Sequence, residues 1–204
     1  MRGIHKYWAT FIMGCGIALA VGAADTKDAQ DASEEFVKKA SMASLFEIEA
    51  AEVALDRSRN PDVRAVAEKM IQDHKRSSDK LRDLLTQEKL RFRFSMTLDE
   101  AHAEKVRELK DVKAAAFDKE YLSMQENAHE DTIKVFETFL GARDTNPVLR
   151  TYAEETLPTL KKHHERIDGV QEKSQSLLNR ARSMRVQVAL MRSASPGGTS
   201  AYIS

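Results

Sequence analysis

The sequence contains little of what disulfide-bonded, β-rich or nucleic-acid-binding proteins depend on. Of its 204 residues, one is cysteine (Cys15), four are proline, eight are glycine and 6% are aromatic. A single cysteine excludes an intrachain disulfide and a thiolate metal cluster. Scarce turn-forming residues disfavour a β-sandwich. The 32 basic and 32 acidic side chains cancel, and no basic stripe with interleaved aromatics stands out, so nucleic acid is not an expected partner.

The first 24 residues differ in composition from the remainder of the chain. Arg2 and Lys6 precede an almost wholly apolar stretch, and small residues stand at its end. This order is typical of a secretory signal peptide, with cleavage after Ala23 or Ala24. We therefore expect an exported protein of the periplasm or cell envelope. The polar residues 25–32 that follow are interpreted as a linker.

Two alternatives to a cleaved signal remain open. Residues 8–24 could stay as an uncleaved membrane anchor, because 17 residues lie at the short end of the spanning range. The motif IMGC, which ends at Cys15, resembles a bacterial lipoprotein box, and acylation there would also anchor the chain. Membrane association through residues 8–24 is compatible with any function of the domain that follows.

Four long segments carry apolar residues at steps of three and four, which is the helical period. The second and fourth begin after Asn-Pro, a capping residue followed by proline at the first helical position. We expect one helical domain over residues 33–185. The end of the chain, SASPGGTSAYIS, is small, polar and rich in Pro and Gly, so residues 186–204 are predicted to be a disordered tail. The expected helices span residues 33–57, 61–89, 114–140 and 147–180.

The two Asn-Pro starts belong to a longer match. NPDVRAVAE at 60–68 and NPVLRTYAE at 146–154 are identical at five positions of nine. This similarity indicates two related helical hairpins. The connection between them, residues 89–113, is long enough to cross the length of a bundle. The predicted fold is therefore all-α, a ferritin-like four-helix bundle built from two helical hairpins joined by a long crossover.

The crossover itself contains a helix signal. Thr97 and Glu100 have the spacing of a capping box, which predicts a short helix beginning at Leu98.

Each predicted long helix places a polar residue where its apolar stripe calls for a hydrophobic one. These residues are Glu47 in the first helix, His74 in the second, His129 in the third, and either His163 or His164 in the fourth. One such histidine is usually a core residue with a hydrogen-bond partner. Four helices with the same substitution indicate that the polar side chains meet.

Distances along the helices place these polar residues on one level. Glu47 and His74 lie 13 and 14 residues on either side of the first Asn-Pro turn, roughly 20 Å from it. His129 and His163 each lie 17 residues from the second turn, roughly 25 Å away. With the two turns at opposite ends of a bundle about 45 Å long, both pairs share one layer.

Imidazole and carboxylate groups that converge in a dry core need a proton, a water molecule or a metal ion to satisfy them. Neutral histidine with carboxylate is a common ligand set for iron, zinc, manganese and copper. A metal-free network of hydrogen bonds between Glu and His would also satisfy these groups and fix the helix register. Both interpretations stay open from the residues alone.

Other polar residues near the layer are weaker ligand candidates. Glu126 and His129 have the Glu-x-x-His spacing of di-iron bundles, but the second such motif that a di-iron site needs is missing. Glu49 flanks the layer and points more sideways, as do Asp73 and Glu130. One further group consists of Asp118 and Tyr121, one helical turn apart in FDKEY, where Tyr121 could carry a hydrogen bond or a proton toward the layer.

Three stretches carry a resemblance to a known family. FEIEAAEVALDRSRNPDVRAVAEKMIQDH, FDKEY with a downstream His129, and LPTLKKH resemble the domain of unknown function DUF4142, an exported bacterial ferritin-like family whose members are often described as membrane or outer-membrane proteins. The similarity covers about residues 33–168. It implies a ferritin-like four-helix fold with recurring Glu and His at Glu47, His74, His129 and His163. It therefore favours His163 over His164, and it names no reaction.

The sequence thus predicts an exported four-helix bundle that binds a transition-metal ion through Glu47, His74, His129 and His163. A use in redox or stress protection follows by analogy with ferritin-like folds. Catalysis is not assigned, because one His-rich site lacks the carboxylates of a ferroxidase. The alternative is a non-enzymatic envelope protein whose buried polar network is structural and whose charged faces bind a partner.

Overall fold

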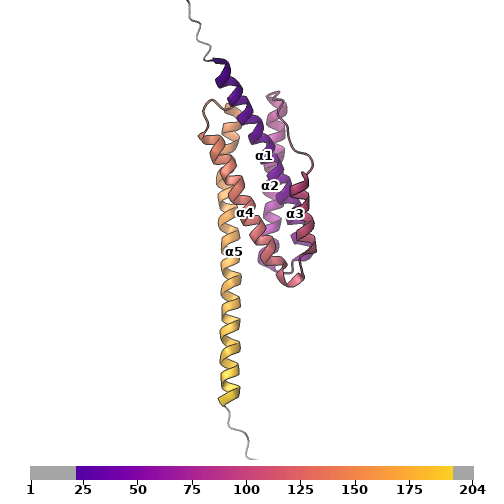
Figure 1. Ribbon diagram of the computed structural model, residues 1–204, viewed down its shortest axis with the longest axis vertical. Coiled ribbons are helices and arrows are strands. Elements are labelled where there is room, and N and C mark those ends of the chain that lie inside the picture. Colours follow the sequence, from indigo (N-terminus) through magenta and orange to yellow (C-terminus); the bar gives the residue numbers. More distant parts are fainter. Residues whose placement is uncertain (1–21, 195–204) are drawn as a thin grey trace, which may run out of the picture.

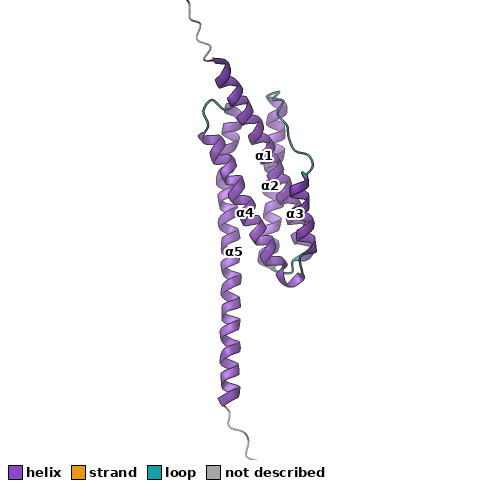
Figure 2. Ribbon diagram, viewed as in Figure 1, coloured by secondary structure: helices purple, strands orange, loops and turns teal. Residues whose placement is uncertain are grey.

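The computed structural model describes residues 22–194, and these fold into five helices joined by loops, without a strand (Figures 1 and 2). The predicted all-α, ferritin-like bundle is confirmed. The residues expected to form the signal peptide or anchor lie mostly before Gly22, outside the described part. None of the helices within residues 22–194 combines the length and the apolar character needed to cross a bilayer. The helices are α1 (Gly22–Arg57), α2 (Pro61–Gln87), α3 (Glu100–Asp111), α4 (Ala114–Gly141) and α5 (Pro147–Ala194).

Two antiparallel hairpins make up the bundle, as the internal match predicted. α1 packs on α2 and α4 packs on α5, while α1 also contacts α4 and α2 contacts α5. The short α3 lies in the crossover between the hairpins and packs mainly against α1 (Figure 1). The second half of α5 runs beyond the end of the bundle (Figure 1).

The two Asn-Pro turns use the same capping chemistry. The Asn60 side chain accepts a hydrogen bond from the backbone N–H of Asp62 at 2.9 Å, and the Asn146 side chain accepts from two N–H groups of α5 at 3.0 and 3.1 Å. Arg64 and Arg150, four residues after each Asn, reach back to carbonyl groups at the end of the preceding helix. The repeated Asn-Pro-x-x-Arg therefore caps both helices of each hairpin at once.

The structure extends several helices beyond their predicted ends. Residues 25–32, which were interpreted as a linker, belong to α1, because no Gly or Pro interrupts the chain between Gly22 and Pro61. Residues 186–194 of the predicted tail continue α5 for the same reason, and residues 195–204 lie outside the described part. The crossover helix begins at Glu100 and not at Leu98, because its N-cap is Asp99, whose side chain accepts from the His102 N–H at 2.9 Å.

The hydrophobic core consists of two clusters along the bundle. One contains Phe46, Met70 and Phe117 with their neighbours, and the other contains Phe36, Leu81 and Phe136 with theirs. In α2, α4 and α5 the predicted His stands between a segment of the first cluster and a segment of the second, and in α1 Glu47 follows Phe46 where the first cluster begins. A buried polar layer therefore separates the two apolar halves of the core.

Candidate metal centre

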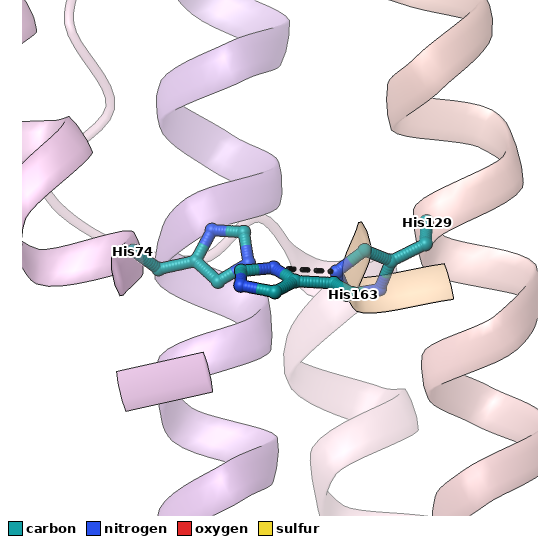
Figure 3. Close-up of side chains that lie close together, drawn as sticks. All are labelled: His74, His129 and His163. Carbon is teal, nitrogen blue, oxygen red and sulfur yellow. Dashed lines mark hydrogen bonds between the residues drawn. The ribbon is translucent and has the colours of Figure 1, made fainter. Parts of the chain in front are cut away.

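The four residues predicted from the apolar stripes come together in that layer. Glu47 and His129 are fully buried, and His74 and His163 are each 3% exposed. Each of the three histidines contributes one ring nitrogen, and these three nitrogens all lie within 4.8 Å of one another (Figure 3). The expectation that both hairpins bring their polar residues to one level is met.

Glu47 contacts two of the three imidazoles, those of His74 and His129, through one carboxylate oxygen. Its Oε2 lies 2.5 Å from His74 Nε2 and 3.3 Å from His129 Nε2. His129 Nε2 is also 3.3 Å from His163 Nδ1, the contact drawn in Figure 3. Although Glu47 Oε2 and His74 Nε2 are close, their geometry is not that of a hydrogen bond.

The outward-facing ring nitrogens of the histidines have acceptors of their own. His129 Nδ1 lies 2.9 Å from the backbone carbonyl oxygen of Gln125, which can only accept, so Nδ1 carries the hydrogen. His163 Nε2 lies 2.8 Å from Asp73 Oδ2 and donates to that carboxylate. The third outward nitrogen, His74 Nδ1, lies 3.4 Å from the hydroxyl oxygen of Ser44.

These tautomers leave bare nitrogens at the centre. A neutral imidazole has one N–H, so a hydrogen on His129 Nδ1 leaves Nε2 as a lone pair, and a hydrogen on His163 Nε2 leaves Nδ1 as one. The 3.3 Å contact between these two inner nitrogens then joins two acceptors. A cation at the centre resolves this conflict, since histidines that bind metal donate their other N–H to a carboxylate or a carbonyl.

Burial controls the charge of the layer. It lowers the pKa of His163 to about 4, partly offset by the hydrogen bond to Asp73, and it lowers the pKa of His129 as well. For Glu47, burial acts to raise the pKa, but attraction to His129 and His74 outweighs it and lowers the pKa to about 2. Near neutral pH the layer therefore combines a carboxylate with neutral His129 and His163, the protonation states that bind metal ions.

Two of the interatomic distances suit a small transition-metal ion. In a tetrahedral site with bonds of about 2.0–2.1 Å, ligand atoms lie about 3.3–3.4 Å apart. The 3.3 Å separations of His129 Nε2 from His163 Nδ1 and from Glu47 Oε2 match that edge. The 2.5 Å separation of Glu47 from His74 is shorter and would have to widen on metal binding.

Further buried polar groups surround the layer, and the sequence stripes did not single them out as site residues. Asp73 was interpreted as pointing sideways and solvated, but it is 7% exposed and holds His163. Its other contacts are Lys69 at 3.0 Å and Arg76 at 2.9 Å, and their cationic side chains cover it from the surface. Thr132, one turn after His129, places its hydroxyl 3.4 Å from Glu47 Oε1.

Tyr121 lies close enough to the layer to respond to its charge. The side chain is fully buried, and its hydroxyl has no hydrogen-bond partner within residues 22–194. Burial and, after it, the negative charge of Glu47 raise the pKa of this hydroxyl well above its ordinary value. The predicted position of Tyr121 beside the layer is thus consistent with the structure, and the tyrosine stays protonated there.

The remaining weaker candidates do not reach the layer. Glu49 and Asp118 are half-buried, and within residues 22–194 neither forms a hydrogen bond or ion pair with the four central residues. Glu126 points into a different group, where one oxygen from it lies within 4.8 Å of ligand atoms of His164 and Asp168, and it accepts a hydrogen bond from Gln171 at 2.9 Å. The choice of His163 over His164 agrees with the structure, since His164 lies outside the layer with its side chain 25% exposed.

A surface groove leads toward one side of the layer. It lies between α1, α3 and α4, has a volume of about 770 Å³, and its lining includes Met42, Phe46, Met124 and Thr132. Thr132, which lines this groove, also lies 3.4 Å from the Glu47 carboxylate and therefore connects the groove to the layer.

Comparison with known proteins agrees with the resemblance noted in the sequence. The sequence model of DUF4142, described as a domain of unknown function, matches residues 18–170. The chain belongs to the DUF4142 family. The matched region includes all four central residues of the layer and ends before the part of α5 that leaves the bundle. No curated protein matches the chain.

One solved structure shares the fold of this DUF4142 protein. The crystal structure of a DUF305 fragment from Deinococcus radiodurans superposes with a TM-score of 0.60 at 15% sequence identity. The alignment covers 70% of the present chain and 96% of that fragment. At this identity the likeness concerns the helical fold alone.

Proposed function

We propose that this DUF4142 protein binds one transition-metal ion between Glu47, His74, His129 and His163, and that metal binding is its biochemical function. The observation that carries the proposal is the convergence of three buried imidazoles, two of them in contact with the Glu47 carboxylate, with N–H groups of His129 and His163 facing outward onto acceptors. A metal-free network would need a proton between His129 and His163, and burial disfavours the additional charge on both rings.

Three observations support a metal site at these residues. Three neutral imidazoles with one carboxylate form a set that zinc, iron, manganese and copper all accept. Asp73 and the Gln125 carbonyl supply the outer contacts that orient metal-binding histidines. The groove lined by Thr132 offers an approach for an ion toward the Glu47 carboxylate.

Elemental analysis of the untagged protein, purified from its native compartment, tests the proposal. We expect about one equivalent of a transition metal per chain, as in a mononuclear site. The metal should be lost from His74→Ala and His129→Ala, and His164→Ala is the matched control, because it removes a neighbouring imidazole outside the layer. Circular dichroism at 222 nm establishes that each variant is still helical.

The alternative, a structural polar network in an envelope protein, gives a different result in the same experiment. Protein that contains no metal, and that binds none when zinc, iron, copper and manganese are added in turn, would contradict the proposal. The same conclusion follows if chelator leaves the thermal unfolding midpoint unchanged. Retained metal in His129→Ala would show that the ion binds elsewhere.

The redox or stress-protective use and the exported location form part of the same proposal. A redox use requires a metal that changes oxidation state, so zinc as the native ion would contradict it while leaving metal binding intact. Export is supported by the signal-like composition of residues 1–24. Fractionation of the native cells with N-terminal sequencing of the mature chain distinguishes cleavage after Ala23 or Ala24 from a retained anchor.

A further inference from the structure

The last part of α5 has a composition unlike the bundle. The final acidic residue of the chain is Glu172, and five basic residues follow it: Lys173, Arg180, Arg182, Arg185 and Arg192. All 32 acidic residues lie between residues 25 and 172, together with 25 basic ones, since two of the 32 basic residues precede residue 25 and five follow residue 172. The chain therefore joins a bundle of net charge −7 to a helix end of +5.

The same helix end exposes a row of large apolar side chains. Lys173 pairs with Asp62 of α2 at 2.6 Å, and beyond it α5 runs clear of the bundle (Figure 1). Leu177, Met184 and Val188 are 55%, 65% and 49% exposed. Among the described residues outside α5, Met96 is the single large hydrophobic side chain that is exposed. Water-exposed apolar side chains gathered in this way mark an interaction surface.

Leu177, Met184 and Val188 lie on one face of the helix, whereas the exposed Leu178 and Leu190 lie off it. Leu177, Ala181, Met184 and Val188 follow one another at steps of four, three and four, which forms a single stripe along the axis. We call these four residues the α5 seam. With 3.6 residues per turn, Arg180 falls on one side of the seam, and Arg185 and Arg192 fall on the other. Val186 points to the opposite face of the helix.

A partner for this surface has to be both apolar and negatively charged. A second copy of the chain does not offer that combination in its described residues. Its bundle is acidic but has no exposed apolar patch to match the seam, and its own seam is apolar but surrounded by arginines that would repel. None of the four arginines after Lys173 forms an ion pair within residues 22–194.

We propose that the α5 seam binds the surface of an anionic phospholipid membrane, with the arginines beside it at the lipid headgroups. An amphipathic helix with arginines flanking its apolar stripe lies in the membrane interface and binds through buried apolar area plus attraction to anionic lipids. The −7 bundle is repelled by the same surface, so the projecting helix end meets the membrane first. This inference is independent of the metal centre and of residues 1–24.

A tryptophan placed on the seam tests the proposal in the full-length chain. Trp8 is the only native tryptophan, so Trp8→Phe gives a silent background. In that background, Met184→Trp should shift its fluorescence to the blue with vesicles of phosphatidylglycerol and phosphatidylcholine, and not with phosphatidylcholine alone. Val186→Trp is the matched control, because this equally exposed position lies on the opposite face and should shift much less. The signal reports on α5 whatever residues 1–24 do.

Variants that remove the arginine charges test how much those charges contribute to membrane binding. Each arginine near an anionic surface favours binding by roughly a factor of five, so Arg180→Gln, Arg185→Gln and Arg192→Gln together should lower partitioning on the order of a hundredfold. Added salt should weaken binding of the native sequence and have little effect on the triple variant. These surface positions lie outside the hydrophobic core, and circular dichroism at 222 nm verifies that the variants keep their helices.

Several results would overturn the proposal. They are an absent shift in Met184→Trp, an equal shift in Val186→Trp, or equal binding to neutral vesicles. A dimer in analytical ultracentrifugation that Leu177→Ser and Val188→Ser dissociate would assign the seam to a second copy. Binding of a single-stranded oligonucleotide that competes with the vesicles and does not need the seam would assign the arginines to nucleic acid.

Discussion

Acidification from pH 7 to pH 5 should destabilise the metal-free protein, and His163 is the residue from which the effect can be calculated. Burial lowers its pKa to about 4, from an ordinary value of about 6.5. Between these two values the unfolded chain holds a proton on this ring and the folded protein does not. Stability therefore falls as the pH falls, because the unfolded state gains the additional proton.

The expected loss is about 2 kcal/mol for His163 alone, from integration of the proton linkage between pH 7 and pH 5. His129 acts in the same direction, since burial lowers its pKa too. Glu47 contributes later. Its pKa of about 2 lies below the ordinary value of 4.5, so its stabilising contribution is present above pH 4.5 and is lost as the pH falls toward 2.

Urea unfolding at pH 7 and pH 5, followed by circular dichroism in excess chelator, measures this loss. His163→Gln should remove about 2 kcal/mol of the difference between the two pH values, whatever it does to stability at pH 7. His164→Gln is the matched control and should keep most of the difference. The reasoning fails if His163→Gln and the native sequence lose equal stability on acidification, or if the native protein becomes more stable at pH 5.

Three further outcomes follow from individual contacts. Tyr121→Phe removes a buried hydroxyl without a described partner, so urea unfolding of the metal-free protein should show unchanged stability or a gain of about 1–2 kcal/mol. Arg150→Met deprives two carbonyls at the end of α4 of a charged donor and should cost about 2 kcal/mol in the same assay, whereas exposed Arg143→Met should cost less than about 0.5 kcal/mol. Asp73→Asn should weaken metal binding about 10- to 100-fold in chelator competition, with Glu49→Gln as a neutral control. Loss of helix in Asp73→Asn, or unchanged affinity, would contradict its assigned role in orienting His163.

The sequence predicted the parts of this protein that depend on local chemistry and period. Asn60 and Asn146 identified two helix starts because capping and proline geometry are local. His74 and His129 were identified because a polar residue on an apolar stripe has no other place to point than the core. The register of the hairpins then followed from the rise of a helix, which is why counting residues from each turn placed the pairs at one level.

Other features depended on packing that no local pattern contains. Asp73 lies one residue from the stripe, and a sideways carboxylate on a helix is usually solvated. It is buried here because α5 brings His163 to it and because Lys69 and Arg76 cover it. The end of α5 was misjudged for a different reason. Its apolar and basic residues were assigned to the same disordered tail as the small polar residues after them, although no helix breaker occurs between Gly169 and Pro196.

The two hairpins are related at their turns but not at their polar layer, and this difference bears on how many ions the site can hold. The 86-residue offset that superposes Asn60 on Asn146 pairs His74 with Leu160 and His163 with Ser77. A di-iron bundle repeats its ligands, including four carboxylates, across both halves. Here one carboxylate stands among three imidazoles, and one more, Asp73, lies behind His163.

The charge of that set favours one divalent ion. Glu47 contributes one negative charge, the charge of Asp73 is already paired with Lys69 and Arg76, and neutral histidines contribute none. A single divalent cation therefore leaves one net positive charge in the layer. A second divalent ion would add two more uncompensated positive charges among buried groups, a state that desolvation makes very costly. Metal titration should therefore saturate at one ion per chain in the layer, and a second equivalent bound with similar affinity, lost together with the first in His129→Ala, would refute this charge argument.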